Sequence, residues 1–195
     1  MFTGLVQTLA EVVDVVSEPP GVRLVIRGPQ IASKTKIGDS IAVNGCCLTV
    51  VANDGQRLEF QAGEETLSRT NLAQMAVGAR VNLESSLKAG DEIGGHYVTG
   101  HIDAVGTIDD RRDDEEWSTI WFRAPAAQLK QMASKGSVAV DGVSLTLVEV
   151  EDDRFSVALI PFTLAATTLG QKRVGDRVNI ETDVLAKYVE RQLSY

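Results

Sequence analysis

The side chains in this sequence that are best suited to proton transfer or nucleophilic attack are two histidines and two cysteines. His96 and His101 lie in the stretch GGHYVTGHID, and Cys46 and Cys47 are adjacent in NGCCLTV. Histidine suits proton transfer because its ordinary pKa lies near neutrality, and a cysteine thiolate can act as a nucleophile. A free cysteine is also often a small buried hydrophobe. Because adjacent strand residues face opposite ways, we expect at most one cysteine to face a ligand.

The same residues predict neither a metal site nor a disulfide framework. The two histidines are five positions apart, an odd spacing, so on one continuous strand they would point to opposite faces. No cluster of further cysteines or carboxylates completes a zinc ligand set, and adjacent cysteines cannot join distant segments. We expect His96 to have a structural role in a connection, where Gly94 and Gly95 permit unusual dihedral angles.

The composition limits the function classes that these residues can serve. The 195 residues are 44% hydrophobic and only 5% aromatic, which is enough apolar material for an aliphatic core. A net charge of −8 argues against binding to nucleic acid or to an anionic membrane surface, because both need clustered Lys and Arg. No apolar run reaches the roughly 20 residues of a membrane helix, and Glu11 and Asp14 interrupt the N-terminal run, unlike a signal peptide. We predict a cytoplasmic protein.

The chain contains a repeat with an offset of 97 residues. GDSIAVNGCCLTVV, which begins at Gly38, aligns with KGSVAVDGVSLTLV, which begins at Lys135, with 7 identities in 14 positions. Residues 57–84 align with residues 154–181 with 12 identities in 28 positions. FTGLV near the N-terminus pairs with VTGHI at an offset of 96, so His101 takes the position of Leu5. Such self-similarity predicts two copies of one domain.

Each copy is predicted to consist mostly of strands. Short apolar runs flank an Asn-Gly pair in SIAVNGCCLTVV and an Asp-Gly pair in SVAVDGVSLTLV, which is a strong hairpin signal. RVNLE and RVNIE alternate polar and apolar residues, as half-buried strands do. Several short strands favour a small antiparallel barrel or sandwich in each copy. The last segment, TDVLAKYVERQLSY, instead predicts an amphipathic helix that a neighbouring subunit would cover.

Six motifs in order resemble riboflavin synthase of the α-chain type. They are MFTGLV, NGCCLTV, ETLSRTNL, GGHYVTGHID, DGVSLTL and LIPFTLAATTLG, and together they span nearly the whole chain. The resemblance implies an all-β fold of two tandem six-stranded antiparallel Greek-key β-barrels followed by a C-terminal α-helix, here placed at residues 1–96, 97–183 and 184–195. It also implies a homotrimer with sites between subunits, although a tail helix would serve a dimer as well, and lumazine synthase as a further partner.

The resemblance implies a reaction between two copies of one substrate. A riboflavin synthase moves a four-carbon unit from one 6,7-dimethyl-8-ribityllumazine to another, giving riboflavin and 5-amino-6-ribitylaminouracil, with no cofactor and no metal. A duplicated domain supplies two related pockets, and holding two reactants in a near-attack geometry can lower a barrier by roughly 7–11 kcal/mol. One lumazine must lose a proton from its 7-methyl group, and the other must become electrophilic at ring carbon 7.

Residue by residue, the resemblance places catalysis where the two copies have diverged. His101 matches Leu5 and Cys47 matches Ser144, so His101 is the first catalytic candidate and Cys47 the second. Further catalytic candidates by resemblance are Phe2, Ser40, Thr66, Lys135, Ser144 and Asp183. Main-chain or side-chain contacts to substrate are expected from Gly4, Leu5, Val6, Cys47, Leu48, Thr49, Gln61, Ala62, Gly63, Glu64, Glu65, Thr66, Gly100, His101, Ile102, Lys135, Ser144, Leu145, Thr146, Ala158, Leu159, Ile160, Pro161, Phe162 and Thr163.

Two other classes of protein compete with the enzyme. Non-catalytic, fluorescent lumazine- or flavin-binding proteins share the duplicated barrel but lack the equivalents of GGHYVTGHID and of the CLTV cysteine, which are both intact here. A flavin-dependent reductase would need a nicotinamide-binding domain, and no glycine-rich strand–turn–helix fingerprint occurs. The chain departs from the family at Cys46 and at Phe162, where a polar residue is common and whose counterpart in the first copy is Glu65. We expect Phe162 to alter one edge of the second pocket.

Overall fold

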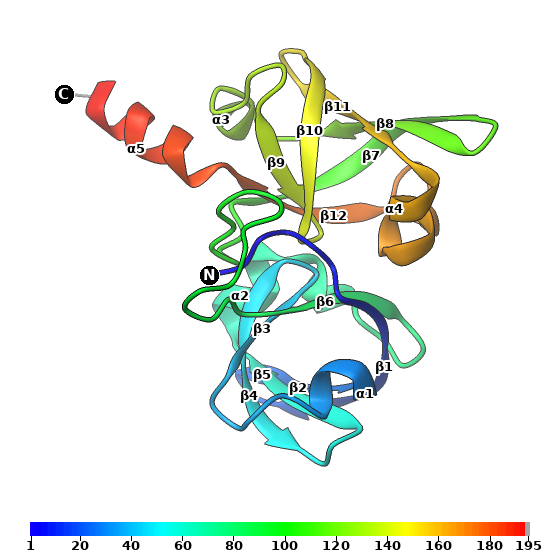
Figure 1. The fold of residues 1–195 in the computed structure, drawn as a ribbon, viewed down its shortest axis with the longest axis vertical. Coiled ribbons are helices and arrows are strands. Elements are labelled where there is room, and N and C mark those ends of the chain that lie inside the picture. The colour runs from blue at the N-terminus through cyan, green and yellow to red at the C-terminus, as the bar shows by residue number, and fades with distance from the viewer. Residues whose placement is uncertain (194–195) are drawn as a thin grey trace.

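The computed structural model describes residues 1–193, which form two closed six-stranded antiparallel β-barrels followed by a helix (Figure 1). Around the first barrel the strands follow the order β1-β2-β5-β4-β3-β6, and the second barrel repeats this order with each number raised by six. The predicted fold class is therefore confirmed. The strands are β1 (Thr8–Glu18), β2 (Gly21–Arg27), β3 (Ser40–Val43), β4 (Cys46–Asn53), β5 (Arg57–Ala62), β6 (Arg80–Ser85), β7 (Ala104–Asp114), β8 (Trp117–Arg123), β9 (Ser137–Val140), β10 (Val143–Val150), β11 (Arg154–Leu159) and β12 (Arg177–Thr182).

Short helices follow the second and the fifth strand of each barrel. After the fifth strand a helix leads into a 3-10 turn, whose start is capped by a threonine hydroxyl, Thr70 or Thr167, that accepts a backbone N–H. The threonines shared by ETLSRTNL and FTLAATTL therefore give both copies the same local structure. The helical bounds are α1 (Pro29–Ala32), α2 (Glu64–Arg69), η1 (Asn71–Gln74), α3 (Ala126–Leu129), α4 (Pro161–Ala166) and η2 (Thr168–Gly170).

Each barrel encloses its own aliphatic core, because its strands alternate between inward and outward side chains. On β4 the inward residues Cys46, Leu48 and Val50 pack in the first core, while Cys47 and Thr49 face outward. On β10, Leu145 and Leu147 occupy the second core in the same way. Full burial of one such aliphatic side chain contributes about 1.5–3 kcal/mol. The outward residues of β4 and β10 are thus free of a core role.

The two predicted hairpin turns meet at the junction of the barrels. Asn44 and Gly45 have φ of 46° and 78°, and Asp141 and Gly142 have φ of 46° and 76°, as tight hairpin turns require. A Cβ atom on Gly45 would lie 2.7 Å from the backbone nitrogen of Gly142. Only glycine at these positions allows the turns to approach so closely.

Buried amide groups connect the barrels across this junction. The Asn82 side chain donates to the carbonyl oxygen of Asp141 at 2.8 Å, and the Asn179 side chain donates to the carbonyl oxygen of Asn44 at 2.9 Å. The Asn71 side chain donates to the Asp141 carboxylate at 2.8 Å. Because a buried polar group left without a partner is costly, these bonds fix the orientation of one barrel against the other.

The last helix, α5 (Val184–Leu193), projects away from the second barrel (Figure 1). None of its residues is buried, and Leu185, Tyr188, Val189 and Leu193 are exposed. Its base is held by Lys187, whose ammonium lies 2.7 Å from the carboxylate of Asp103. The predicted tail helix is confirmed as far as Leu193, and residues 194–195 lie outside the described part. None of the helices within residues 1–193 is long and apolar enough to cross a membrane.

Candidate active site

The first half-site is the outward face of β4 together with residues 100–102 of the other copy. The backbone N–H of Cys47 donates to the carbonyl oxygen of Gly100 at 2.9 Å, which brings the exposed His101 next to this face. Ile102 packs against the core of the first barrel, although it belongs to the second repeat. The backbone that leads into His101 therefore lies against the strand that carries Cys47, because a segment crosses between the barrels.

The second half-site is the outward face of β10 together with residues 4–6. The backbone N–H of Ser144 donates to the carbonyl oxygen of Gly4 at 2.8 Å, and Val6 packs against the core of the second barrel. Leu5, which is 50% exposed, occupies the place that His101 has in the first half-site. The first residues of each repeat thus pack on the barrel of the other repeat. The two half-sites therefore have the same backbone arrangement but different side chains, with His101 in one and Leu5 in the other.

A buried glutamate anchors each crossing segment. Glu181 accepts the N–H groups of Thr99 and Gly100 at 2.6 and 2.9 Å, and Glu84 accepts those of Thr3 and Gly4 at 2.7 and 3.0 Å. Burial raises the pKa of both carboxyls, and these hydrogen bonds oppose the rise. The final Glu of RVNLE and RVNIE, for which the strand pattern alone predicts no such role, therefore holds the crossing segments in place.

The adjacent cysteines have different environments. Cys46 lies in the core of the first barrel, where burial raises the pKa of its thiol to about 12, with smaller contributions from Cys47 and Glu181. Cys47 is half-buried and packs against a small cluster that includes Phe2 and Val98. The two cysteines face opposite sides of the strand, as the alternation predicts, and the outward one is Cys47.

His96 takes part in the second half-site, which the sequence reasoning missed. Its ring Nδ1 lies 2.7 Å from the Ser144 hydroxyl oxygen, and its backbone N–H donates to the carbonyl oxygen of Thr3. Burial lowers the pKa of His96, and the Asp183 carboxylate opposes this shift. His96 therefore lies in the connection, where the sequence predicts a structural role, and it also contacts the catalytic candidate Ser144.

The glycines before His96 serve close packing rather than unusual dihedral angles. Neither Gly94 nor Gly95 has a positive φ. A Cβ atom on Gly95 would lie 2.1 Å from the carbonyl oxygen of Thr3 and 2.9 Å from the Ser144 hydroxyl, and one on Gly94 would lie 2.6 Å from the Leu5 side chain. A histidine preceded by two glycines was therefore a sequence signal for a backbone that passes tightly over a site.

The N-terminal ends of α2 and α4 differ in chemistry between the two barrels. In the first barrel this edge carries Glu65 and Thr66; the Glu65 carboxylate pairs with Arg69 at 3.0 Å. In the second barrel the corresponding edge exposes Ile160 and Phe162, and Phe162 is 76% exposed. This end of the helix is consequently charged in the first barrel and apolar in the second.

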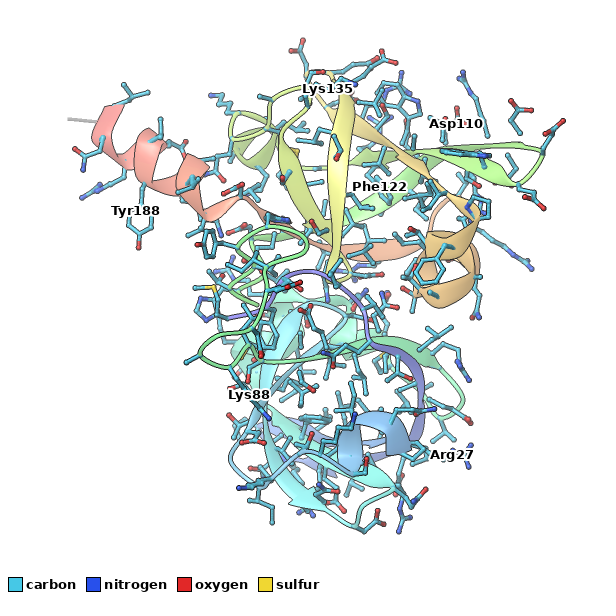
Figure 2. All side chains as sticks on the ribbon, in the orientation of Figure 1. Arg27, Lys88, Asp110, Phe122, Lys135 and Tyr188 are labelled. Atoms are coloured by element: carbon cyan, nitrogen blue, oxygen red, sulfur yellow. The ribbon has the colours of Figure 1, made fainter. Side chains whose placement is uncertain are left out.

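The remaining catalytic candidates do not all gather at these half-sites. Phe2 is fully buried and its backbone pairs with that of Val98 between the barrels, so its ring packs in the small cluster below Cys47 and is not exposed to a ligand. Asp183 accepts the N–H of Leu185 at 2.9 Å, at the start of α5. Figure 2 places Lys135 at the end of the second barrel remote from the first barrel, in a turn with φ of 68°.

A groove of about 920 Å³ runs along the first barrel between α1 and the segment after β6. Leu5, Val6 and Ser40 line it, together with the charged residues Lys34 and Lys88. Cys47 and His101 do not line this groove. Ser40, which pairs with Thr49 across β3 and β4, therefore lies on a surface that Leu5 also reaches.

The predicted substrate contacts separate into two groups by burial. The buried residues can contact a ligand only through main-chain atoms, because they are glycines of the crossing segments or have side chains that point into a barrel. Buried are Gly4, Leu48, Ala62, Gly100, Leu145 and Leu159, whereas Leu5, Val6, Cys47, Thr49, Gln61, Gly63, Glu64, Glu65, Thr66, His101, Ile102, Lys135, Ser144, Thr146, Ala158, Ile160, Pro161, Phe162 and Thr163 are exposed or half-buried.

Comparison with known proteins agrees with this duplicated arrangement. The lumazine binding domain family matches the chain twice, over residues 3–86 and 99–183, so that two such domains in tandem define the class of protein. Riboflavin synthase of Mycobacterium bovis is 46% identical over 98% of this chain and 97% of its own length. Riboflavin synthase of Brucella abortus is 41% identical over 100% of this chain and 99% of its own length. The chain belongs to the riboflavin synthase family.

Solved structures with the same fold come from a ligand-binding relative. LumP complexed with 6,7-dimethyl-8-(1′-D-ribityl) lumazine superposes with a TM-score of 0.84 at 29% identity, covering 93% of this chain and 99% of that one. LumP complexed with riboflavin gives a TM-score of 0.86 at 29% identity and the same coverage. The fold of this chain is thus shared with proteins that hold lumazine and flavin ligands.

Proposed function

We propose that this protein catalyses the dismutation of two 6,7-dimethyl-8-ribityllumazine molecules to riboflavin and 5-amino-6-ribitylaminouracil. The observation that carries the proposal is the crossing of residues 100–102 to the first barrel, which brings the backbone before His101 against the strand that carries Cys47. A protein that only held ligands would have no need for an exposed histidine and an outward cysteine in one of two otherwise matching half-sites. The membership of the riboflavin synthase family supports the same reaction.

The two half-sites suit two different tasks. His101 is the group proposed to move a proton at the 7-methyl carbon of the lumazine in the first half-site. Cys47 lies beside it as a candidate nucleophile, and Thr66 borders the same face. In the second half-site, Ser144 would hydrogen-bond to the other lumazine while the apolar Leu5 and Phe162 pack against its ring. Positioning of the two rings supplies the larger part of the rate.

We further propose that the complete site lies between two subunits of a homotrimer. On a single chain α5 exposes the apolar side chains of Leu185, Tyr188 and Val189, which a neighbouring subunit would cover. Lys135, which lies at the end of the second barrel remote from the first, would approach the substrates from a neighbour. Domains at residues 1–96, 97–183 and 184–195, a cytoplasmic location and an association with lumazine synthase belong to the same proposal.

The test of the reaction is a mixture of the purified protein with 6,7-dimethyl-8-ribityllumazine and no cofactor. We expect one riboflavin for every two lumazines consumed, faster than in a protein-free control. His101→Gln should slow turnover by roughly 10²-fold or more, which is the usual worth of a positioned acid–base group, with nearly unchanged lumazine binding. Tight binding without acceleration would instead make the protein a lumazine or flavin carrier, and equal rates in wild type and variant would remove His101 from the mechanism.

The trimer has its own test. Deletion of residues 187–195 removes the exposed part of α5 and its contact with Asp103, and it leaves both barrels intact. We expect sedimentation velocity to show a trimer for the full chain and smaller species for the truncated one, with a loss of activity that tracks dissociation. An unchanged sedimentation coefficient would contradict the role of α5.

A further inference from the structure

His96 and Ser144 form a contact that the reaction scheme above does not use. The ring of His96 is only 9% exposed and its Nδ1 lies 2.7 Å from the Ser144 oxygen. Its second ring nitrogen, Nε2, is buried without a hydrogen-bond partner among the described residues. Ser144 itself is half-buried on the outward face of β10, where a ligand of the second half-site would lie.

The environment of the ring determines which nitrogen carries its proton. Burial in this connection disfavours the charged imidazolium, so the ring is neutral and holds one N–H. Asp183 is the charged group that opposes this effect. A buried N–H without an acceptor is rarer and more costly than a bare lone pair. With Nε2 unpartnered, the proton therefore belongs on Nδ1, which donates to the Ser144 oxygen.

A serine that accepts a hydrogen bond has a restricted hydroxyl. The hydroxyl has one proton and two lone pairs, and the Nδ1–H of His96 occupies one lone pair. Its own proton then points away from the histidine, toward the open face of the half-site. The close passage of Gly95, whose added Cβ would lie 2.9 Å from the same oxygen, leaves little room for another rotamer.

We infer that His96 is a positioning residue that fixes the Ser144 hydroxyl as a hydrogen-bond donor toward a carbonyl oxygen or ring nitrogen of the lumazine in the second half-site. The inference rests on the proposed function and assigns a role to a residue outside the set of catalytic candidates. It also explains why the second half-site can work without an exposed histidine. A fixed donor stabilises negative charge that develops on the bound ring, at no reorganisation cost during the reaction.

The kinetic test uses two substitutions that imitate different ring nitrogens. The amide nitrogen of His96→Asn occupies the place of Nδ1 and can still donate to Ser144, whereas the longer side chain of His96→Gln places its amide near Nε2. We expect His96→Gln to lower kcat by about 10- to 100-fold with KM changed less than about threefold, as for other orienting partners of reactive groups. His96→Asn should keep kcat within about threefold of wild type.

A double-mutant cycle separates orientation from packing. If His96 acts through Ser144, then His96→Gln should cause little further loss of kcat in a Ser144→Ala background. Additive losses, or equal losses for His96→Asn and His96→Gln, would overturn the inference in favour of a role in packing. Thermal midpoints of all variants show whether a loss of kcat reflects unfolding.

A measurement without turnover keeps this inference distinct from the reaction itself. The ¹⁵N chemical shifts of the His96 ring in the wild-type protein should show a neutral ring with its proton on Nδ1, and Ser144→Ala should change that pattern. A proton on Nε2 would overturn the inference even in a fully active enzyme. Absence of riboflavin formation together with the Nδ1 tautomer would refute the proposed function and leave the His96–Ser144 geometry standing.

Discussion

Gly100 is the residue at which a single added methyl group should do most harm to the first half-site. Its φ of 82° lies in the left-handed region, and an added Cβ atom would lie 2.6 Å from the Cβ of Cys47 and 2.9 Å from the ring of Phe2. Gly38 provides a matched control, because its φ of 92° is equally unfavourable for alanine but nothing lies within 4 Å of an added Cβ. The pair Gly100→Ala and Gly38→Ala therefore separates crowding from backbone strain.

The expected magnitudes follow from these two contributions. A left-handed conformation costs an alanine about 1–2 kcal/mol, and overpacking a tight contact costs about 1–3 kcal/mol more. Gly38→Ala should show only the first contribution and Gly100→Ala both. In a chain of this length, each kcal/mol corresponds to about 2–4 °C in the thermal midpoint. Gly100→Ala should also lower turnover, because Gly100 must move and its carbonyl oxygen then releases the N–H of Cys47.

Thermal unfolding and riboflavin formation measured on both variants provide the assay. We expect Gly100→Ala to lose clearly more stability than Gly38→Ala, and only Gly100→Ala to lose activity beyond what its unfolded fraction explains. Gly4→Ala, whose added Cβ would lie 2.6 Å from the Cβ of Ser144, should behave like Gly100→Ala. The reasoning would be refuted if Gly100→Ala were as stable and as active as Gly38→Ala.

Two further predictions concern buried titratable groups. A thiol reagent at pH 7.5 should modify Cys47 and spare Cys46, because burial raises the pKa of Cys46 to about 12; peptide mass spectrometry reads the outcome, and comparable labelling of both in the folded protein would contradict the core position of Cys46. Burial raises the pKa of Asp141, so the folded chain holds that proton more tightly than the unfolded chain. The stability due to Asp141 is then fully present below an ordinary Asp pKa of about 4 and is lost as the pH rises through the raised value. Relative to Asp141→Asn, which copies Asn44 of the first barrel, wild type should lose thermal stability as the pH rises above about 4, and parallel pH profiles would be the contrary result.

Local patterns were sufficient for most of the architecture. The Asn-Gly and Asp-Gly turns require positive φ at two successive positions, and few residue pairs accept this at low cost. Alternation in NGCCLTV assigned Cys46 and Cys47 to opposite faces, because the strand period is two. The 97-residue repeat means that each of these predictions applies to both copies of the domain. These features depend on neighbours in the sequence, so the sequence alone could reveal them.

The composition of each half-site could not be read in this way. His101 belongs to the second repeat but lies on the first barrel, and Leu5 does the reverse, because residues 2–6 and 98–102 cross between barrels. This exchange depends on contacts more than 40 residues apart in the chain, such as Cys47 with Gly100 and Gly4 with Ser144. Neither the periodicity of hydrophobic residues nor the secondary-structure propensity of a segment indicates which distant segment it will contact.

The sequence by itself determined two strand-rich copies, their hairpin turns and the placement of Cys46 and Cys47 on opposite faces of one strand. Only the tertiary structure decided that His96 contacts Ser144, that Glu84 and Glu181 anchor the crossing segments, and that Gly95 serves close packing. The physical reason is that hydrogen bonds and van der Waals contacts between distant segments depend on where the barrels dock. That docking is fixed by buried amides such as Asn82 and Asn179, whose role appears only once both barrels have formed.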